Sequence, residues 1–338
     1  MQEKQGRQKI SLVSVIVSVF NEEGGLRQFY DAASKVLSEL KEGGCSLPYE
    51  LLFVNDGSLD GSGRILSELK AEDPEHVSVI SFSRNFGHEA AMTAGLDYAS
   101  GDVLIFMDAD LQHPPGLIPD IIRELSGGYQ IVNMVRTKNE SAGLVKNICS
   151  RAFYSIINLM SDMHIEPSAS DFFAMDKAAA SVLRSNYREK VRFLRGYVQN
   201  IGFRKTVLEY EAGERSFGKS HYSFKRLWRL SMDTLICFSD VPLKLGMYAG
   251  FFSALAGVLL ILYTLVTRGT APGGYATIVI ALCFMFAVLF IIVGVIGEYI
   301  SVIFKEIKDR PIYIISDMEL SKAHSENAPV PREEHQDI

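Results

Sequence analysis

The sequence predicts an α/β fold in which a mostly parallel, Rossmann-like sheet is followed by a hairpin of two transmembrane helices. From residue 13 to residue 135, short apolar runs alternate with segments of helical pattern, as in sheets covered by helices on both faces, whereas residues 140–213 show a less regular pattern. Residues 245–266 and 269–297 contain no charged residue, and each run is close to the roughly 20 residues that cross a bilayer as a helix. The formal net charge of −6 gives no indication of a nucleic-acid partner.

Five apolar runs are predicted to be strands because they are short, rich in β-branched residues and bounded by polar residues. They are VSVIVSV (13–19), ELLFVND (50–56), VSVISFS (77–83), DVLIFMD (102–108) and QIVNMV (130–135). Helical patterns fill the intervals, over residues 24–40, 61–71, 88–99 and 119–125. Further along, residues 145–160 are predicted as a helix, and residues 168–183 as a strand that leads into a helix.

Polar residues follow four of these strands at the point where each strand ends. The groups are Asn21-Glu22-Glu23, Asn55-Asp56, Ser83-Arg84-Asn85 and Asp108-Ala109-Asp110. Ligands of open α/β sheets bind beyond the carboxyl ends of the strands. The sequence therefore predicts a binding site at this edge of the sheet.

Two carboxylates, Asp108 and Asp110, stand where the fourth predicted strand ends. Like charges held close together disfavour each other's ionisation unless a positive group lies between them. Hard oxygen donors suit Mg²⁺ or Mn²⁺, and Gln112 would add a neutral oxygen. Asp56 is expected at the adjacent strand end, whereas Asp60 is interpreted as a helix cap. The alternative for the aspartate pair is an ordinary turn or cap, because two aspartates in a loop are common.

Basic residues flank the two charge-free runs. Lys244 precedes the first run, and Lys305, Lys308 and Arg310 follow the second. Cytoplasmic flanks of transmembrane helices carry an excess of Lys and Arg, so both ends of the hairpin are expected on the cytoplasmic side of the membrane. The alternative is a pair of buried helices in a soluble protein, which two successive charge-free runs of this length disfavour.

The domain boundaries follow from these patterns. We expect a cytosolic catalytic domain (1–213), a basic amphipathic segment on the inner leaflet (214–242), the hairpin (243–304) and a cytosolic tail (305–338). The alternative for the basic segment, which contains Trp228, is an ordinary solvated helix face. The tail is polar from Ser316 and is predicted to be disordered. The N-terminus has no apolar core of signal-peptide type and is expected to stay in the cytosol.

Several stretches of the chain resemble glycosyltransferase family 2, which has the GT-A fold. They are SVFNEE (18–23), VNDGSLDGS (54–62), SRNFGHEAAMTAGL (83–96) and DADLQHPP (108–115). Within the family they look most like the polyprenyl-phosphate glycosyltransferases, a group that includes dolichol-phosphate mannose synthase and bactoprenol glucosyltransferase. The pattern Arg215-x-x-Gly218-x-Ser220-x-Tyr222 resembles a later signature of that branch, and the hairpin fits its bacterial membrane-anchored members. The resemblance thus implies a bacterial inner membrane as the location.

The resemblance implies a nucleotide-sugar donor, with UDP-glucose as the first guess, a divalent cation and a polyprenyl-phosphate acceptor. The residues that would surround the base and ribose are Phe20, Glu22, Asp56 and Arg84. Those that would hold the metal and the diphosphate are Asp108, Ala109, Asp110 and Gln112. Arg136 and Arg151 match positions that grip the acceptor phosphate, and Asp171 stands in the sugar and catalytic pocket.

The chemistry of such an acceptor reduces the need for a general base. A phosphate monoester has a second pKa of about 6, so it is largely dianionic at neutral pH and already nucleophilic. The reaction then needs cationic clamps, for which Arg136, Arg151, Arg215 and Lys219 are candidates. We expect a single inverting displacement. For Arg215 and Lys219 the alternative role is general attraction to lipid headgroups. For Asp171 two roles stay open, proton abstraction and substrate orientation.

Two other functions remain open at this point, a processive polysaccharide synthase and a non-catalytic membrane scaffold that binds a nucleotide sugar. His88 and Met92 are interpreted as packing or capping residues of their helix, and His113 as a residue that shapes its loop. Packing between the hairpins of two or more copies of the chain would produce a homo-oligomer, which stays an alternative to a monomer.

Overall fold

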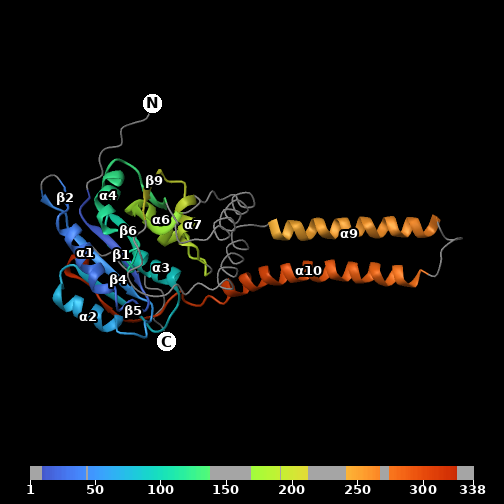
Figure 1. Cartoon of the computed structure of the whole chain (residues 1–338), viewed down its shortest axis with the longest axis horizontal. Helices are drawn as coiled ribbons and strands as arrows, with labels where there is room; N and C mark the ends of the chain where they lie inside the picture. Colours follow the sequence, from blue (N-terminus) through green and yellow to red (C-terminus); the bar gives the residue numbers. More distant parts are fainter. Residues whose placement is uncertain are drawn as a thin grey trace, which may run out of the picture. The chain divides into compact units, whose positions relative to one another are not determined.

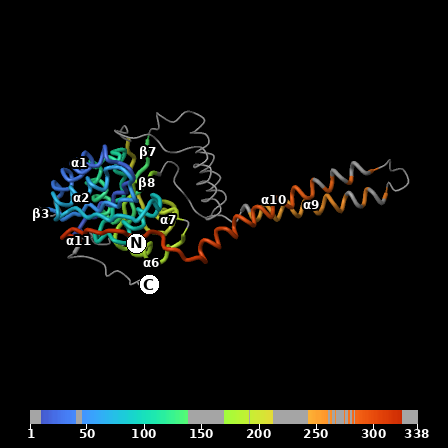
Figure 2. The backbone as a smooth tube through the Cα atoms, turned by 90° about the horizontal axis from the view of Figure 1, so that it is seen from below, coloured from blue at the N-terminus to red at the C-terminus, as the bar shows by residue number. Residues whose placement is uncertain are grey.

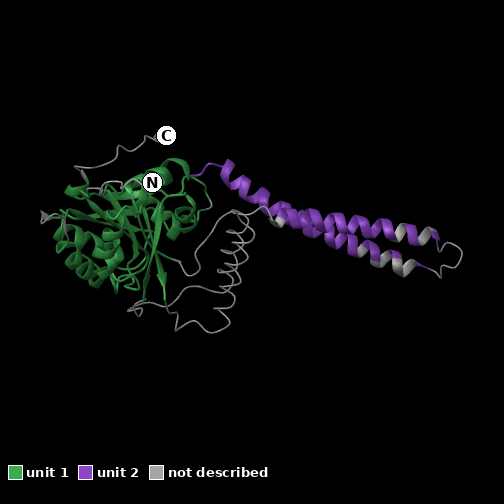
Figure 3. Ribbon diagram, turned by 90° about the horizontal axis from the view of Figure 1, so that it is seen from above, with its two compact units in different colours: residues 1–151, 164–221, 311–338 green, residues 152–163, 222–310 purple. Residues whose placement is uncertain are grey.

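The structure is a computed structural model, and it describes residues 10–42, 45–137, 169–190, 192–211, 241–266 and 274–325. The chain divides into two compact units (Figure 3). The first contains residues 1–151, 164–221 and 311–338, and the second contains residues 152–163 and 222–310. In the sequence, segments of the first unit therefore both precede and follow the helices of the second unit.

An eight-stranded sheet forms the centre of the first unit (Figure 1). Its strand order is β10-β5-β4-β1-β6-β8-β7-β9. The strands are β1 (Val13–Val19), β4 (Tyr49–Asn55), β5 (Val77–Phe82), β6 (Val103–Asp108), β7 (Ile131–Arg136), β8 (Ala169–Asp176), β9 (Lys205–Tyr210) and β10 (Ile315–Glu319). A separate two-stranded sheet pairs β2 (Lys41–Glu42) with β3 (Cys45–Ser46).

The strand directions confirm the predicted mostly parallel sheet. β5, β4, β1 and β6 run parallel to one another, and β7 pairs with β9 in parallel. β8 is antiparallel to both β6 and β7, and β10 is antiparallel to β5. The central strands are buried along almost their whole length, which explains their continuously apolar sequences.

Helices cover both faces of the sheet. On one face α1 (Leu26–Ser38) packs against α2 (Ser62–Glu72) and α4 (Ile118–Ser126), which follows the short 3₁₀ helix η1 (Pro115–Leu117). On the other face α3 (His88–Tyr98) contacts α6 (Lys177–Asn186) and α7 (Leu194–Asn200). The buried residues of α1 recur every three or four positions, as its amphipathic pattern predicts: Leu26, Phe29, Ala33 and Leu37.

Close packing holds α3 against the middle of the sheet. A Cβ atom at Gly95 would lie 2.1 Å from the Cγ2 atom of Ile16 on β1, so only a glycine lets the helix come this near. All seven residues from Ala90 to Leu96 are buried. The N-terminus of α3 is therefore fixed in depth relative to the carboxyl ends of the strands.

The C-terminal tail returns to the first unit, so the prediction that it is disordered from Ser316 is wrong for residues 316–325. β10 adds an antiparallel edge strand to β5, and α11 (Lys322–Ser325) follows it (Figure 2). The ring of Tyr313 stacks on that of Phe82, with the ring centres 5.3 Å apart. Its hydroxyl donates to the Asp97 carboxylate at 2.7 Å, which ties the tail to the C-terminal end of α3.

A buried polar contact anchors α11 to the sheet. His324 and Glu50 have side chains that are 3 % and 0 % exposed, and the His324 Nδ1 atom lies 3.1 Å from a Glu50 carboxylate oxygen. The other carboxylate oxygen accepts hydrogen bonds from the Ser14 hydroxyl and from the backbone N–H of Ser100. Burial opposes ionisation, but the contacts with His324, Ser100 and Ser14 bring the pKa of Glu50 below its ordinary value.

The second unit contains two long apolar helices, α9 (Val241–Val266) and α10 (Tyr275–Ile307). Large apolar side chains on both helices stay exposed, such as Phe251 (64 %) and Phe290 (70 %). Within the described residues one stretch, Phe284–Ile307, has the length and composition to cross a membrane, with a mean hydropathy of 2.5. The apolar stretch found in α9, Leu243–Leu259, is shorter.

Replacing Glu50 by glutamine is expected to lower the free energy of unfolding of the full chain by about 3 kcal/mol, because His324, Ser14 and Ser100 lose a buried carboxylate as their hydrogen-bond acceptor. Since the folded-state pKa of Glu50 is lowered, the wild-type contribution is present above the ordinary glutamate pKa and is lost as the pH falls through the folded-state pKa. Chemical denaturation in detergent, followed by circular dichroism at several pH values, measures both effects.

The matched control is Glu75→Gln. Glu75 also pairs with α11, through Lys322 at 3.7 Å, but both side chains are mostly exposed. An exposed pair contributes little, so this variant should stay within about 0.5 kcal/mol of the wild type. Equal losses in the two variants would contradict the assignment of Glu50 as the anchor.

Candidate active site

The polar strand ends meet at one edge of the sheet, as the sequence predicts. Ser18 on β1 lies opposite Asp108 on β6, and Val19 lies opposite Asn55 on β4. Asp56 follows β4, however, and β1 lies between β4 and β6. The expectation that Asp56 stands at the strand end adjacent to Asp108 is therefore wrong.

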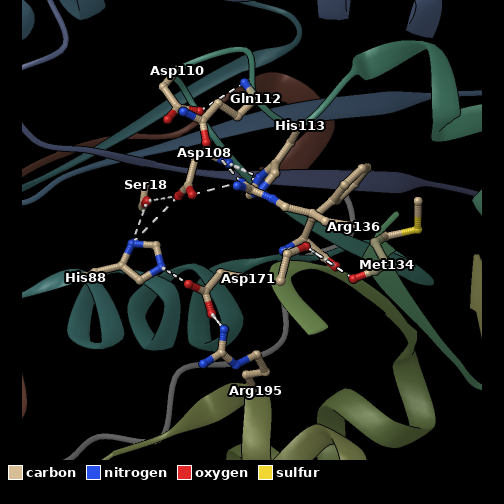
Figure 4. A network of polar contacts seen from close by, with 12 residues as sticks. Ser18, His88, Asp108, Asp110, Gln112, His113, Met134, Arg136, Asp171 and Arg195 are labelled. Carbon is tan, nitrogen blue, oxygen red and sulfur yellow. Dashed lines mark hydrogen bonds and ion pairs between the residues drawn. The ribbon is translucent and has the colours of Figure 1, made fainter. Parts of the chain in front are cut away.

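Asp108 is held by contacts to its backbone and its side chain (Figure 4). Its backbone N–H donates to the Nδ1 atom of His113 at 3.0 Å, and the Ser18 hydroxyl donates to its carboxylate at 3.1 Å. His113 is buried, and its ring stacks on Phe172 with the ring centres 5.0 Å apart. Burial lowers the pKa of His113, although Asp108 opposes this shift. His113 thus shapes the loop as predicted.

The turn after Asp108 has a strained backbone. Leu111 has a φ of +60°, in the left-handed region that a branched, non-glycine residue rarely occupies. The Asp110 carboxylate accepts the backbone N–H of Gln112 at 3.1 Å across this residue. Such strain is concentrated at functional sites, where the surrounding structure fixes the direction of particular side chains. Here it sets the directions of Asp110 and Gln112, while Ala109 between the two aspartates is buried in the core.

Arg136 lies beside this turn and is held in a chain of hydrogen bonds. Its guanidinium donates to the side-chain oxygen of Gln112 at 3.0 Å and to the Tyr210 hydroxyl at 3.0 Å. Tyr210 donates in turn to Ser170, whose hydroxyl donates to the backbone carbonyl of Met134 at 3.2 Å. Arg136, predicted to bind phosphate, is thus brought next to the aspartate turn and cannot turn away without breaking this chain.

The donor set near Asp108 suits a hard divalent cation. The carboxylates of Asp108 and Asp110 are oxygen ligands of the kind that Mg²⁺ and Mn²⁺ prefer. Among the described residues no group of three or more His, Cys, Asp and Glu side chains could hold a metal alone. The oxygen of Gln112 already accepts from Arg136. Two carboxylates would therefore bind such an ion only together with oxygens of water or of a phosphorylated substrate.

Asp171 stands between two positive groups that complete the site. Its carboxylate lies 3.3 Å from Arg195 on α7 and 3.8 Å from the Nε2 atom of His88 on α3. Burial opposes its ionisation, but Arg195 and then His88 bring the pKa of Asp171 below the usual aspartate value. The pKa of His88 is raised in return, because Asp108 and Asp171 outweigh the effect of burial.

The interpretation of His88 as a packing or capping residue is wrong, since its ring lies among the site carboxylates. Its position directly after a strand-end loop, in SRNFGH, was a signal that could have identified it. Arg195 carries no comparable signal, because only the packing of α7 against β8 and α3 brings it to Asp171. Met92 is buried in α3 and packs as predicted.

Asp56 organises the loop between β5 and α3. Its buried carboxylate accepts the backbone N–H groups of Phe86 at 2.6 Å and Gly87 at 2.9 Å, and the side-chain amide of Asn85 at 2.8 Å. Burial raises the pKa of Asp56, and the Phe86 and Gly87 amides oppose that shift. Arg84 from the same loop lies 4.0 Å from the centre of the Phe86 ring.

The remaining predicted residues fall into two groups. Arg84, Phe20 and Glu22 lie at the same edge of the sheet, where Arg84 is exposed, Phe20 is 43 % exposed and Glu22 is half-buried. Asp60 accepts the backbone N–H groups of Ser62 and Glu23, but the N-cap of α2 is Gly61, so Asp60 joins the start of α2 to the loop after β1 instead of capping the helix as predicted. The other candidates lie outside the described residues: Arg151, Arg215, Lys219, the predicted helix 145–160 and the basic segment up to residue 240.

Comparison with known families gives a direct match to this domain. Residues 14–183, which carry the strand ends and the aspartate turn, match the family model for glycosyl transferase family 2. The chain belongs to this family. Residues 241–303 of this family 2 glycosyltransferase match a second model, described as the GtrB C-terminal hairpin, which corresponds to most of α9 and α10.

Relatives of the glycosyltransferase extend over most of its length. The Uncharacterized glycosyltransferase YkcC of Bacillus subtilis is 43% identical, over 89% of this chain and 92% of the relative. A prophage-derived bactoprenol glucosyl transferase of Shigella flexneri is 37% identical, over 90% and 97%. Among solved structures, glucosyl-3-phosphoglycerate synthase from Mycobacterium tuberculosis superposes with a TM-score of 0.43 at 18% identity, over 67% of this chain and 78% of that chain.

Replacing Gly57 by alanine is expected to destabilise the fold by about 1–3 kcal/mol. Gly57 has a φ of +64°, and an added Cβ atom would lie 2.3 Å from the carbonyl carbon of Arg84, so the β5–α3 loop must move. The control is Gly63→Ala in α2, where the nearest atom is 3.5 Å away and alanine gains up to about 1 kcal/mol of helix propensity. Thermal unfolding should shift in opposite directions, and shifts of the same sign would contradict this account of the loop.

Proposed function

We propose that this family 2 glycosyltransferase moves a sugar from a nucleotide sugar to the phosphate of a polyprenyl phosphate. The observation that carries the proposal is the convergence of Asp108, Asp110 and Arg136 at the carboxyl end of the sheet. Carboxylates suit a cation that binds a diphosphate, and an arginine suits a phosphate acceptor. The names of the relatives, bactoprenol glucosyl transferases at 34–37% identity, support the acceptor and make UDP-glucose the first donor to test.

The donor would bind across the ends of β5, β4, β1 and β6. Phe20, Glu22, Asp56 and Arg84 form one side of this edge, and we propose that they surround the base and ribose. Asp108 and Asp110 would hold Mg²⁺ or Mn²⁺, which neutralises charge on a departing diphosphate. Gln112 serves in this proposal as a support for Arg136, because its oxygen accepts from that guanidinium.

The acceptor phosphate would be gripped by cationic side chains. Arg136 is already oriented by Gln112 and Tyr210, so it binds an anion without first losing much side-chain freedom. Arg151, Arg215 and Lys219 are proposed as further clamps. Attack of the phosphate oxygen on the anomeric carbon, opposite the departing nucleoside diphosphate, inverts the anomeric centre in one step.

Asp171 is proposed to orient the substrate rather than to abstract a proton. Its pKa is held below the ordinary value by Arg195 and His88, which makes it a weak base. The acceptor also needs little help from a base, because a phosphate monoester is largely dianionic above a pH of about 6. Binding of sugar hydroxyls or of the acceptor by this carboxylate fits both facts.

We propose that α9 and α10 anchor the enzyme in the inner membrane as a two-span hairpin, with the catalytic domain in the cytoplasm. The exposed apolar side chains of both helices and the span Phe284–Ile307 support membrane insertion. A polyprenyl tail stays in the bilayer, so the enzyme must work at its surface. The basic residues 214–242 are proposed to lie on the anionic leaflet.

Transfer of radiolabel from UDP-sugars to butanol-extractable lipid tests this function directly. Membranes that contain the wild-type protein and added polyprenyl phosphate should transfer label in the presence of Mg²⁺ or Mn²⁺ and lose the activity on chelation. Asp110→Ala should lower transfer by about a hundredfold or more. The control is Asp60→Ala, which removes two hydrogen bonds to backbone N–H groups and should cost about 1–2 kcal/mol of stability but leave transfer per folded molecule nearly unchanged.

Two results would count against the proposal. Failure to transfer label from a panel of nucleotide sugars, with either metal, would exclude the enzymatic function. Equal loss of activity in folded Asp60→Ala and Asp110→Ala proteins would remove the aspartate turn from its special role.

A further inference from the structure

We propose that His88 is a positioning residue that holds Asp108 through Ser18 with one ring nitrogen and faces Asp171 with the other. The inference rests on the proposed function, because it concerns how the cation site and the sugar site are held together. Figure 4 shows the imidazole between the two carboxylates, with Ser18 beside its Nδ1 atom.

The Nδ1 side of the ring is connected to Asp108 through Ser18. The His88 Nδ1 atom lies 3.0 Å from the Ser18 hydroxyl oxygen, which donates to the Asp108 carboxylate at 3.1 Å. A serine hydroxyl has a single proton, and here that proton points at Asp108. The ring nitrogen must therefore donate to the hydroxyl oxygen. The order of donors is His88, Ser18, Asp108.

The Nε2 side of the ring faces Asp171. The distance to the nearer carboxylate oxygen is 3.8 Å, and the Nε2 atom is buried without a hydrogen bond among the described residues. The other oxygen of Asp171 faces Arg195 at 3.3 Å. Asp171 is thus paired with Arg195 on α7, while the histidine on α3 lies between it and Asp108.

The backbone of His88 is itself fixed, so its ring can serve as a reference point. His88 is the first residue of α3, and the preceding Gly87 has a φ of +104° and donates its N–H to Asp56. The close approach of Gly95 to Ile16 fixes the depth of the helix. Removing a group that hydrogen-bonds to a metal ligand and orients it commonly lowers metal affinity or activity by about 10–100-fold.

Two substitutions separate the roles of the two ring nitrogens. The amide nitrogen of asparagine takes nearly the place of Nδ1, and that of glutamine takes nearly the place of Nε2. His88→Asn should keep Mn²⁺ affinity within about threefold of the wild type while kcat falls. His88→Gln should weaken Mn²⁺ binding by about 10-fold or more, because the link through Ser18 is broken. Ser18→Ala should weaken Mn²⁺ binding to a similar extent, and His88→Gln/Ser18→Ala no further than either change alone.

Mn²⁺ binding is measured on the full chain in detergent, without donor or acceptor, by the electron paramagnetic resonance signal of free Mn²⁺. Lipid-linked transfer supplies kcat and KM for the same preparations. His76→Asn is the matched control, because His76 contacts Asp73 and Tyr49 away from the site and should leave both readouts unchanged. A thermal unfolding midpoint close to that of the wild type identifies variants that are folded.

The outcomes distinguish the inference from the proposed function. Equal effects of the Asn and Gln variants on Mn²⁺ binding, or no effect of either, would overturn the role of His88 while the wild type still binds Mn²⁺ and transfers sugar. Additive losses in the double variant would overturn the link through Ser18. A wild-type protein that neither binds Mn²⁺ nor transfers sugar would overturn the proposed function and the inference with it.

Discussion

The site depends on keeping carboxylates close together at one edge of the sheet, where β6 ends with Asp108 and the antiparallel β8 begins next to Asp171. Asp108 and Asp171 both lie within 4 Å of the His88 ring, and Arg195 faces Asp171 from the other side. Like charges at such distances raise each other's pKa and weaken the fold unless positive groups compensate them. The helices α3 and α7 supply those groups, so the arrangement of helices on one face of the sheet decides whether the strand ends can carry this charge.

Two positive groups of the site, Arg136 and His88, are in turn held by rigid parts of the fold. Arg136 is held by Gln112 and Tyr210, and His88 follows a loop whose amides bind Asp56. The proposed chemistry demands such rigidity, because a reaction that needs no strong base draws its rate from positioning and from charge already in place. The strained Leu111 fits the same pattern, since it directs its two polar neighbours at the expense of local stability.

Much of the sheet could be predicted from the sequence because its central strands are buried on both faces and therefore read as apolar runs. The polar strand ends could be predicted as well, because carboxyl ends of parallel strands share an edge. Strand order could not: the chain visits β1, β4, β5 and then β6, and nothing local indicates that β6 returns to pair with β1. For this reason the prediction that Asp56 lies at the strand end next to Asp108 was wrong.

The contacts that the sequence did not reveal arise from tertiary packing. In the sequence Arg195 cannot be distinguished from other helical arginines, because only the packing of α7 beside β8 brings it to the site. β10 is short and polar, with the sequence ISDME, because it lies at the sheet edge with much of its surface exposed. An edge strand of this kind lacks the apolar run that marks a central strand, so its composition resembles that of an unstructured tail.

The placement of β10 after the hairpin has a consequence for biosynthesis. Its partner β5 leaves the ribosome early, but the strand that covers its outer edge is made only after α9 and α10. A nascent or prematurely terminated chain therefore displays an open strand edge, a surface on which proteins aggregate and which chaperones and proteases can recognise. The buried contact between His324 and Glu50 can likewise form only in chains that have been translated past α9 and α10.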